Sequence, residues 1–162
     1  MRSLQFAEGL RVPSLKGNGH KLPSLPEGPS QQGTAEQRGI AAAVESQLQE
    51  YFEGKRRTFD LPLDIGQGSE FRRAVWRRVA TIPYAATISY AELAAEAGRP
   101  SAYRAAGSAC GANPIAVIIP CHRVIGSDRK LHGFGGGFDI KRWLLDHEAH
   151  HADANQPQLL KT

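Results

Sequence analysis

The residues best suited to covalent chemistry are a cysteine and a histidine that stand side by side, Cys121 and His122. A thiol is a poor nucleophile until it loses its proton. An adjacent imidazole can take that proton, and nearby cations or hydrogen-bond donors can hold the resulting anion. Taken alone, the pair is equally consistent with a buried cysteine that packs as a small hydrophobic residue. The surrounding sequence must decide between these two interpretations.

A short apolar run leads into the pair. Residues 115–119 include four β-branched side chains, and Pro114 and Pro120 close the run at its two ends. This pattern predicts a short buried strand. Such a strand would deliver Cys121 and His122 together at its C-terminal end.

A carboxylate that could complete the pair lies near the C-terminus. A helix predicted to begin near Phe138–Asp139 has an inward stripe in which Ile140 and Leu144 are followed, at the same helical spacing, by Glu148. Burial of a carboxylate is costly unless the group is paired. We expect His122 to be its partner; exposure at a frayed helix end is the alternative. The nearby His147, His150 and His151 border a polar tail, and we assign them no metal site.

Two short helices before the Cys-His pair predict a helix-turn-helix. Ser89 and Glu92 form a capping box for the first helix, which closes at Gly98, and Ser101 is expected to cap a second helix that runs to about Gly111. The second helix is rich in small residues, which permit close approach to a narrow groove or a sugar-phosphate wall. Packing of an Ala/Gly helix in the core is the alternative explanation.

The flanking segments are also well delimited. Ser69 can cap a preceding helix with an apolar face, ended by Ile82–Pro83, whose opposite face carries Arg72, Arg73, Arg77 and Arg78 and is mostly solvated. After the Cys-His pair, residues 126–137 predict a hairpin-like wing and a glycine-rich loop. That loop has no P-loop spacing.

Length and composition limit the class of protein. The 162 residues suffice for one domain, or one domain and a small appendage, and 41% hydrophobic with 22% charged residues is typical of a soluble globular protein. No run approaches the roughly 18 apolar residues of a membrane span, and the N-terminus lacks a signal-peptide core. Two cysteines, Cys110 and Cys121, are too few for a disulfide scaffold. We therefore expect a free thiol and a cytoplasmic location.

The two halves of the chain differ in charge and in their content of proline and glycine. Residues 1–70 carry 8 Lys/Arg against 9 Asp/Glu, whereas residues 71–150 carry 11 against 6, a net of +5 that favours an anionic partner. A short edge strand is predicted at residues 4–9, and a Pro/Gly-rich linker follows at about 9–33. Thr34 precedes a helical pattern ended by Gly54, and residues 59–63 predict a short strand or an extended connector.

Taken together, the second half of the chain resembles the 6-O-alkylguanine-DNA alkyltransferases, also called methylated-DNA–protein-cysteine methyltransferases. The resemblance covers about residues 69–148, and the block Pro-Cys-His-Arg-Val at 120–124 is highly specific in this setting. The other matching residues are Phe71, Val75, Trp76, Ile82, Pro83, Tyr84, Ser89, Tyr90, Leu93, Ala94, Arg104, Ala105, Asn113, Pro114, Lys141, Leu144, Leu145 and Glu148.

The resemblance implies an α/β (α+β) fold with a C-terminal winged helix-turn-helix alkyltransferase domain at 69–150. A reduced or atypical N-terminal α/β segment at 1–68 precedes it, and a polar tail at 151–162 follows. It also implies DNA repair by a single-turnover enzyme that extrudes an alkylated guanine through the minor groove and moves the alkyl group irreversibly to a cysteine, because a protein thiolate cannot reach the base inside the duplex. Alkylated thymine is a second candidate substrate. The implied partner is double-stranded DNA, with no cofactor, metal, membrane or obligate protein partner, and the implied form is a cytoplasmic monomer, nucleoid-associated when on DNA.

The resemblance also assigns roles to residues at the reacting centre. Cys121 is the acceptor, His122 its general base through a water, and Glu148 the group that orients and charge-compensates His122. Asn113 holds the turn and hydrogen-bonds near the site. Tyr90 helps rotate the nucleotide and donates a proton or hydrogen bond to the departing guanine.

A second set of residues is implied to bind DNA. Arg104 fills the gap left in the base stack, while Ala105 and Gly107 lie against the minor groove. Ser89 and Arg123 complete the DNA-binding set, together with Tyr90.

Departures from the family pattern leave other functions open. Ala85 occupies a turn position that is usually glycine, which we expect to be tolerated, and His132 and Ala116 stand near the expected rim of the base pocket. The chain starts at what resembles the end of the opening hairpin of the family's N-terminal domain, so we expect either a reduced domain or a true start that lies upstream. The alternatives are an alkyltransferase-like protein that binds the lesion without transfer, against which Cys121 itself argues, and a cysteine hydrolase with the same triad.

Overall fold

The computed structural model describes residues 33–66, 68–132 and 134–152. The chain forms two compact units, Met1–Leu63 and Asp64–Thr162. The predicted edge strand at residues 4–9, nearly all of the Pro/Gly-rich linker and nearly all of the polar tail lie outside the described residues. No helix in the described parts of the chain is long and apolar enough to span a bilayer.

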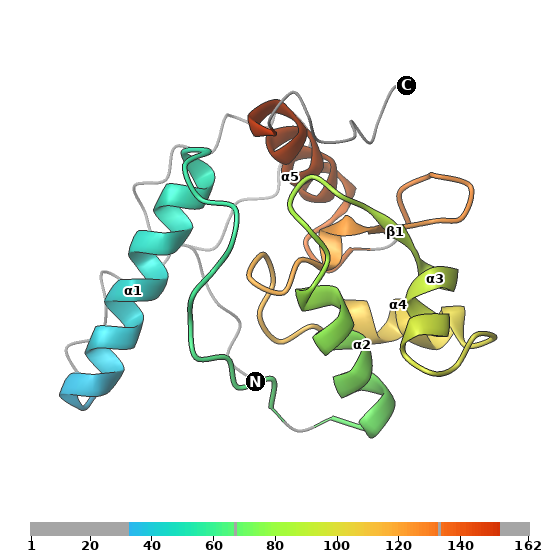
Figure 1. Ribbon diagram of the computed structural model, residues 1–162, viewed down its shortest axis with the longest axis horizontal. Helices are drawn as coiled ribbons and strands as arrows, with labels where there is room; N and C mark the ends of the chain where they lie inside the picture. Colours follow the sequence, from blue (N-terminus) through green and yellow to red (C-terminus); the bar gives the residue numbers. More distant parts are fainter. Residues whose placement is uncertain (1–32, 67, 133, 153–162) are drawn as a thin grey trace. The chain divides into compact units, whose positions relative to one another are not determined.

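Residues 33–63, the described part of the first unit, contain one long helix, α1 (Ala35–Phe52) (Figure 1). It begins at a capping box in which the Thr34 side chain accepts from the backbone N–H of Gln37, and the Gln37 side chain accepts from that of Thr34. Tyr51, its one buried residue, packs against Phe59 with ring centroids 5.5 Å apart. The segment after Gly54 has no regular secondary structure, so residues 59–63 form a connector rather than a strand.

The described residues of the second unit form four α-helices, one 3₁₀ helix and a two-stranded sheet. Its elements are α2 (Glu70–Ala80), β1 (Ile88–Ser89), α3 (Tyr90–Glu96), α4 (Tyr103–Gly111), the 3₁₀ helix η1 (Cys121–Arg123), β2 (Val124–Ile125) and α5 (Phe138–His151). β1 and β2 pair in parallel, with Ile88 opposite Val124 and Ser89 opposite Ile125. α2, α3 and α4 pack on one another, and α5 packs on η1 (Figure 1).

Local capping signals explain where these helices begin. The Ser69 side chain accepts from the backbone N–H of Arg72 at the start of α2, and Ser89 and Glu92 form the predicted capping box of α3. α4 differs from the prediction: it begins at Tyr103 after Ala102, with no side-chain cap. Ser101 instead lies within a backbone turn in which the Ala102 N–H donates to the Arg99 oxygen, and the helix begins directly after this turn.

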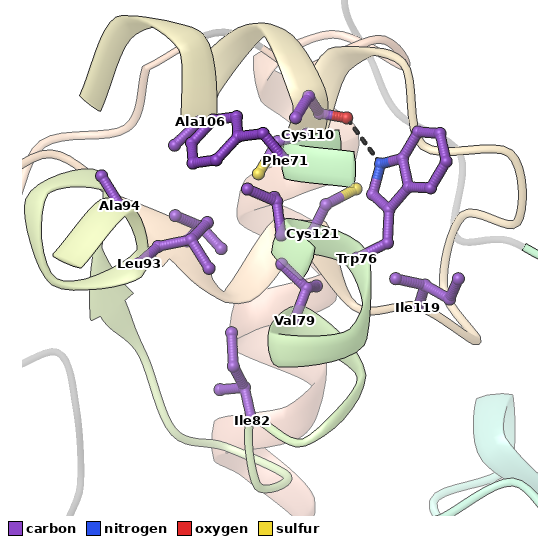
Figure 2. Close-up of a cluster of buried hydrophobic side chains, with 13 residues drawn as sticks. Phe71, Trp76, Val79, Ile82, Leu93, Ala94, Ala106, Cys110, Ile119 and Cys121 are labelled. Carbon is purple, nitrogen blue, oxygen red and sulfur yellow. Dashed lines mark hydrogen bonds between the residues drawn. The ribbon is translucent and has the colours of Figure 1, made fainter. Parts of the chain in front are cut away.

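One core joins the helices to the Cys-His segment. It contains apolar residues of α2, α3, α4 and residues 119–124, including both cysteines (Figure 2). The indole N–H of Trp76 in α2 donates to the backbone oxygen of Ala109 in α4 over 2.8 Å (Figure 2). This bond satisfies a polar atom that would otherwise be costly to bury and fixes α4 against α2.

The apolar run before Cys121 is buried from Val117 to Ile119, but the predicted strand is wrong. Val117 has φ +72°, and the N–H of Ile119 donates to the Ile115 oxygen over 2.9 Å, so the run folds as a tight turn. The Asn113 side chain accepts from the Ile115 N–H over 3.0 Å and donates to the Ile119 oxygen over 2.7 Å. These hydrogen bonds replace those that a neighbouring strand would supply. Buried backbone N–H and C=O groups need hydrogen-bond partners, but these partners need not belong to a sheet.

Candidate active site

Cys121 is the first residue of η1 and lies at the edge of the core, with 5% of its surface exposed. Its backbone N–H donates to the Ile119 oxygen over 2.8 Å, and the Asn113 side-chain amide donates to Sγ over 3.1 Å. The first bond holds the backbone of Cys121 and the second holds its sulfur. Asn113 is both the brace of the tight turn and a direct contact of the thiol.

The environment of Cys121 keeps the resting group a thiol. Burial raises its pKa, since a thiolate is poorly solvated there, while the hydrogen bond from Asn113 and the charge of Lys141 oppose the rise. Deprotonation must therefore be coupled to a base close by.

His122 is fully buried and is held by Glu148 of α5. Its Nε2 lies 2.9 Å from a carboxylate oxygen of Glu148. An ionised carboxylate only accepts hydrogen bonds, so Nε2 carries the proton and Nδ1 is left with a free lone pair. Among the described residues, Nδ1 has no hydrogen-bond partner. Burial lowers the pKa of His122, and the hydrogen bond and charge of Glu148 only partly offset this.

Glu148 is the centre of a buried network. Its two oxygens accept from His122 Nε2, from the Ala85 backbone N–H at 3.0 Å, and from the Arg123 guanidinium at 2.8 to 3.2 Å. Burial alone would raise the pKa of this carboxyl, but the hydrogen bonds and charges of His122 and Arg123 outweigh burial and hold it well below its usual range. Glu148 is therefore ionised at neutral pH and already carries a cationic partner.

Arg123 does not belong to a DNA-binding surface, which corrects its sequence-based assignment. The residue is 5% exposed, and its guanidinium is bound by Glu148, by the Ile82 backbone oxygen at 2.5 Å and by the face of the Tyr84 ring. A cation that is buried and paired in this way is not on the surface where a DNA phosphate would bind. It serves instead as the permanent counter-charge of Glu148.

Tyr90 and Lys141 form a second polar group beside the thiols. Tyr90 opens α3, and its hydroxyl donates to the His132 backbone oxygen over 3.3 Å. Lys141, fully buried on α5, donates to that hydroxyl over 3.3 Å, to the Val124 oxygen over 2.6 Å and to the His132 oxygen over 3.0 Å. Burial raises the pKa of Tyr90 and lowers that of Lys141 to about 8.

The role of Lys141 as a buried cation was not foreseen from the sequence. The available signal was its position on α5, where it shares the buried stripe with Leu144, Leu145 and Glu148 at helical spacing. A lysine at such a position must find partners for its ammonium group, since an unpaired buried charge is costly.

The residues assigned to DNA divide between two places. Arg104 and Gly107 of α4 line an open cavity of about 480 Å³ together with Tyr90, while Ala105 is exposed on the same helix. The remaining cavity residues are Ala91, Tyr103 and the wing residues Gly126, Ser127, Asp128 and His132. Ser89, by contrast, is engaged as the cap of α3. Within the described residues no cluster of His, Cys, Asp or Glu could hold a metal ion.

The fold and the site define a helix-turn-helix protein that carries a buried Cys-His-Glu arrangement. Residues 70–150 match the model of the 6-O-methylguanine DNA methyltransferase DNA binding domain, and residues 32–65 match that of the family's ribonuclease-like domain. The chain therefore belongs to the 6-O-methylguanine DNA methyltransferase family, as the sequence resemblance predicted.

Individual relatives agree with this membership. A methylated-DNA–protein-cysteine methyltransferase of Mycolicibacterium paratuberculosis is 52% identical over 128 residues, covering 78% of this chain and 76% of the relative. The inducible enzyme of Bacillus subtilis is 45% identical over 102 residues, 63% of this chain and 56% of that protein. A crystal structure of Mycobacterium tuberculosis OGT in complex with DNA superposes with a TM-score of 0.67 at 49% identity, covering 70% of each chain. The predicted α/β alkyltransferase fold is thus confirmed.

Proposed function

We propose that this protein repairs DNA by moving an alkyl group from the 6-oxygen of guanine, within duplex DNA, to Sγ of Cys121. The observation that carries the proposal is the contiguous arrangement of Asn113, Cys121, His122 and Glu148, in which each side chain touches or adjoins the next. Family membership supplies the class of reaction, and this arrangement supplies the acceptor.

The reaction is a displacement at the alkyl carbon. The carbon–oxygen bond breaks as the carbon–sulfur bond forms, and its electron pair leaves on the 6-oxygen of guanine. The thiol proton passes through a water to Nδ1 of His122, the ring nitrogen with a free lone pair. Tyr90 supplies a proton or hydrogen bond to the departing base. The thioether product cannot be hydrolysed, so each molecule reacts once.

Arg123 affects this proton transfer through the charge that it places beside Glu148. Burial lowers the pKa of His122, and the charge of Arg123, paired with Glu148, adds to this effect, so His122 is neutral in the resting protein although Glu148 opposes the shift. The imidazolium forms only when the adjacent thiolate forms, and the two new charges then stabilise each other. Base and nucleophile are therefore activated together.

The remaining features of the proposal concern partners. DNA carrying alkylated guanine is the proposed substrate, with alkylated thymine as a second candidate, and Arg104 of α4 fills the gap that the extruded nucleotide leaves. Ala105 and Gly107 lie against the minor groove. The protein acts as a cytoplasmic monomer, associates with the nucleoid when bound to DNA, and needs no cofactor or protein partner.

Intact-mass analysis with peptide mapping tests the proposal directly. After incubation with a duplex containing 6-O-methylguanine, we expect one added methyl group per protein, on Cys121, and no further turnover. Cys121→Ala should bind the duplex without gaining mass, whereas Cys110→Ala, which removes the other buried thiol, should be methylated normally. A methyl group on another residue would refute the assigned acceptor. Binding without any mass change would identify a lesion-binding protein instead.

A further inference from the structure

The exposed face of α4 carries only two long side chains, and they are consecutive. Tyr103 and Arg104 open the helix, whereas the other outward residues are Ala105, Ser108 and Gly111. A face of small residues allows the helix backbone to approach a surface closely, so the two long side chains project ahead of it. Arg104 has a proposed role in the base stack; Tyr103 has none so far.

Tyr103 is unusual because its ring is not used by the core. The residue is 48% exposed, while Ala106, Ala109 and Cys110 form the inner face of α4. Among the described residues of the second unit, the large hydrophobic side chains left this exposed are Tyr103 and Phe138. Only Tyr103 of these two lines the cavity beside Tyr90.

The Tyr103 ring is in contact with Arg104. The guanidinium carbon of Arg104 lies 5.6 Å from the ring centroid, within the range of a cation–π interaction. Within the described part of the chain, no carboxylate pairs with Arg104, so the aromatic ring is its partner in the free protein. When Arg104 enters the base stack, the ring loses this partner and is left facing the DNA.

We propose that Tyr103 is a further DNA-contacting residue, whose ring stacks on the nucleotide next to the gap that Arg104 fills. This inference rests on the proposed function, because it assumes that a nucleotide is extruded. Aromatic rings stack on bases of any sequence, and apolar side chains hold unstacked base steps open. The ring, and not the hydroxyl, is the group that acts. Tyr103 therefore stabilises the extruded state without taking part in the transfer chemistry.

The test compares two substrates that differ in their need for extrusion. Transfer rates are measured with a duplex containing 6-O-methylguanine and with the free nucleoside 6-O-methylguanosine, which has no stack to leave. Stacking of about 1–3 kcal/mol per base corresponds to roughly a 5- to 150-fold effect. We expect Tyr103→Ala to lose that factor in duplex affinity and duplex transfer rate, and to react with the nucleoside at the wild-type rate. Tyr103→Phe should stay within about twofold of wild type on both.

Phe138→Ala is the matched control, because it removes an equally exposed ring, at the start of α5, that does not line the cavity. It should behave as wild type. Three results would overturn the proposal: wild-type duplex transfer by Tyr103→Ala, equal slowing on both substrates, or failure of Tyr103→Phe. If the wild-type protein gains a methyl group from neither substrate, the proposed function fails. The effect of Tyr103→Ala on duplex affinity still tests the stacking contact by itself.

Discussion

Replacement of Glu148 by glutamine should be the most damaging single change in the site. The variant keeps the size of the side chain but removes its charge, and it turns one acceptor into an NH₂ group that faces hydrogen-bond donors. Glu148 is fully buried and accepts from His122, Arg123 and Ala85. The Arg123 guanidinium would then be a buried charge without a counter-ion. Breaking a buried pair in this way costs about 3–5 kcal/mol.

Urea unfolding at pH 7, followed by fluorescence of the buried Trp76, measures this cost. With a slope of about 1–3 kcal/mol per molar for small proteins, the midpoint should fall by at least about 1 M. Glu96→Gln is the matched control, since Glu96 pairs with Arg78 on the surface, with side chains 45% and 28% exposed. That change should cost at most about 1 kcal/mol.

The pH dependence provides an independent check on Glu148. Its pKa in the folded protein is depressed, so its contribution to stability is complete above the ordinary value of 4.5 and is lost as pH falls through the lower folded value. The stability gap between wild type and Glu148→Gln should therefore be constant above the ordinary histidine pKa of 6.5, where His122 no longer titrates, and should narrow as Glu148 is protonated below about pH 4.5. A cost at pH 7 no larger than that of Glu96→Gln would refute this account of the network. If Glu148→Gln does not fold, Glu148→Asp should fold with intermediate stability.

Three further predictions follow from the same site. Ala85 has φ +56°, a left-handed conformation that costs a Cβ-bearing residue about 1–2 kcal/mol. Glycine avoids this strain but loses about 0.4–1 kcal/mol because the unfolded chain becomes more flexible, so Ala85→Gly should stabilise the fold by up to about 1.6 kcal/mol. A lower midpoint in urea unfolding would contradict this. Burial lowers the pKa of Lys141 from 10.5 to about 8. The wild type should therefore gain stability relative to Lys141→Met as the pH rises from about 8 to 10.5. Parallel curves of stability against pH for the two proteins would argue against this. Because burial holds the pKa of His122 below 6.5, single-turnover transfer should not fall by half at pH 6.5, and a titration centred there would show that His122 is not buried as described.

Some parts of the site follow from short-range sequence signals. The caps at Ser69 and Ser89 depend on hydrogen bonds within one helical turn, so residue type and spacing are sufficient to predict them. The pairing of Glu148 with His122 followed from one rule, that a carboxylate on a buried helical stripe needs a partner. Both arguments concern where a polar group finds its hydrogen bonds.

The errors have a common cause in long-range contacts. β-branched residues at 115–119 indicate burial correctly, but their conformation is set by the Asn113 side chain, which supplies the backbone bonds of a turn. The family resemblance places Arg123 in the DNA-binding set, but the structure buries it against Glu148. The orientation of its side chain is set by Glu148, which lies 25 residues further along the chain, and no local sequence pattern indicates this contact.

The position of Cys121 has a consequence for the lifetime of the protein. The proposed acceptor is also a core residue, packed in the same cluster as Val79, Ile119 and Val124. On the proposed reaction, a methyl group is added to a side chain that is only 5% exposed, and extra methylene-sized groups in a packed core typically cost about 1–3 kcal/mol. The reacted molecule is then less stable than the unreacted one, so it opens more often to proteases. A protein that can act only once would thereby favour removal of its spent copies over its active ones.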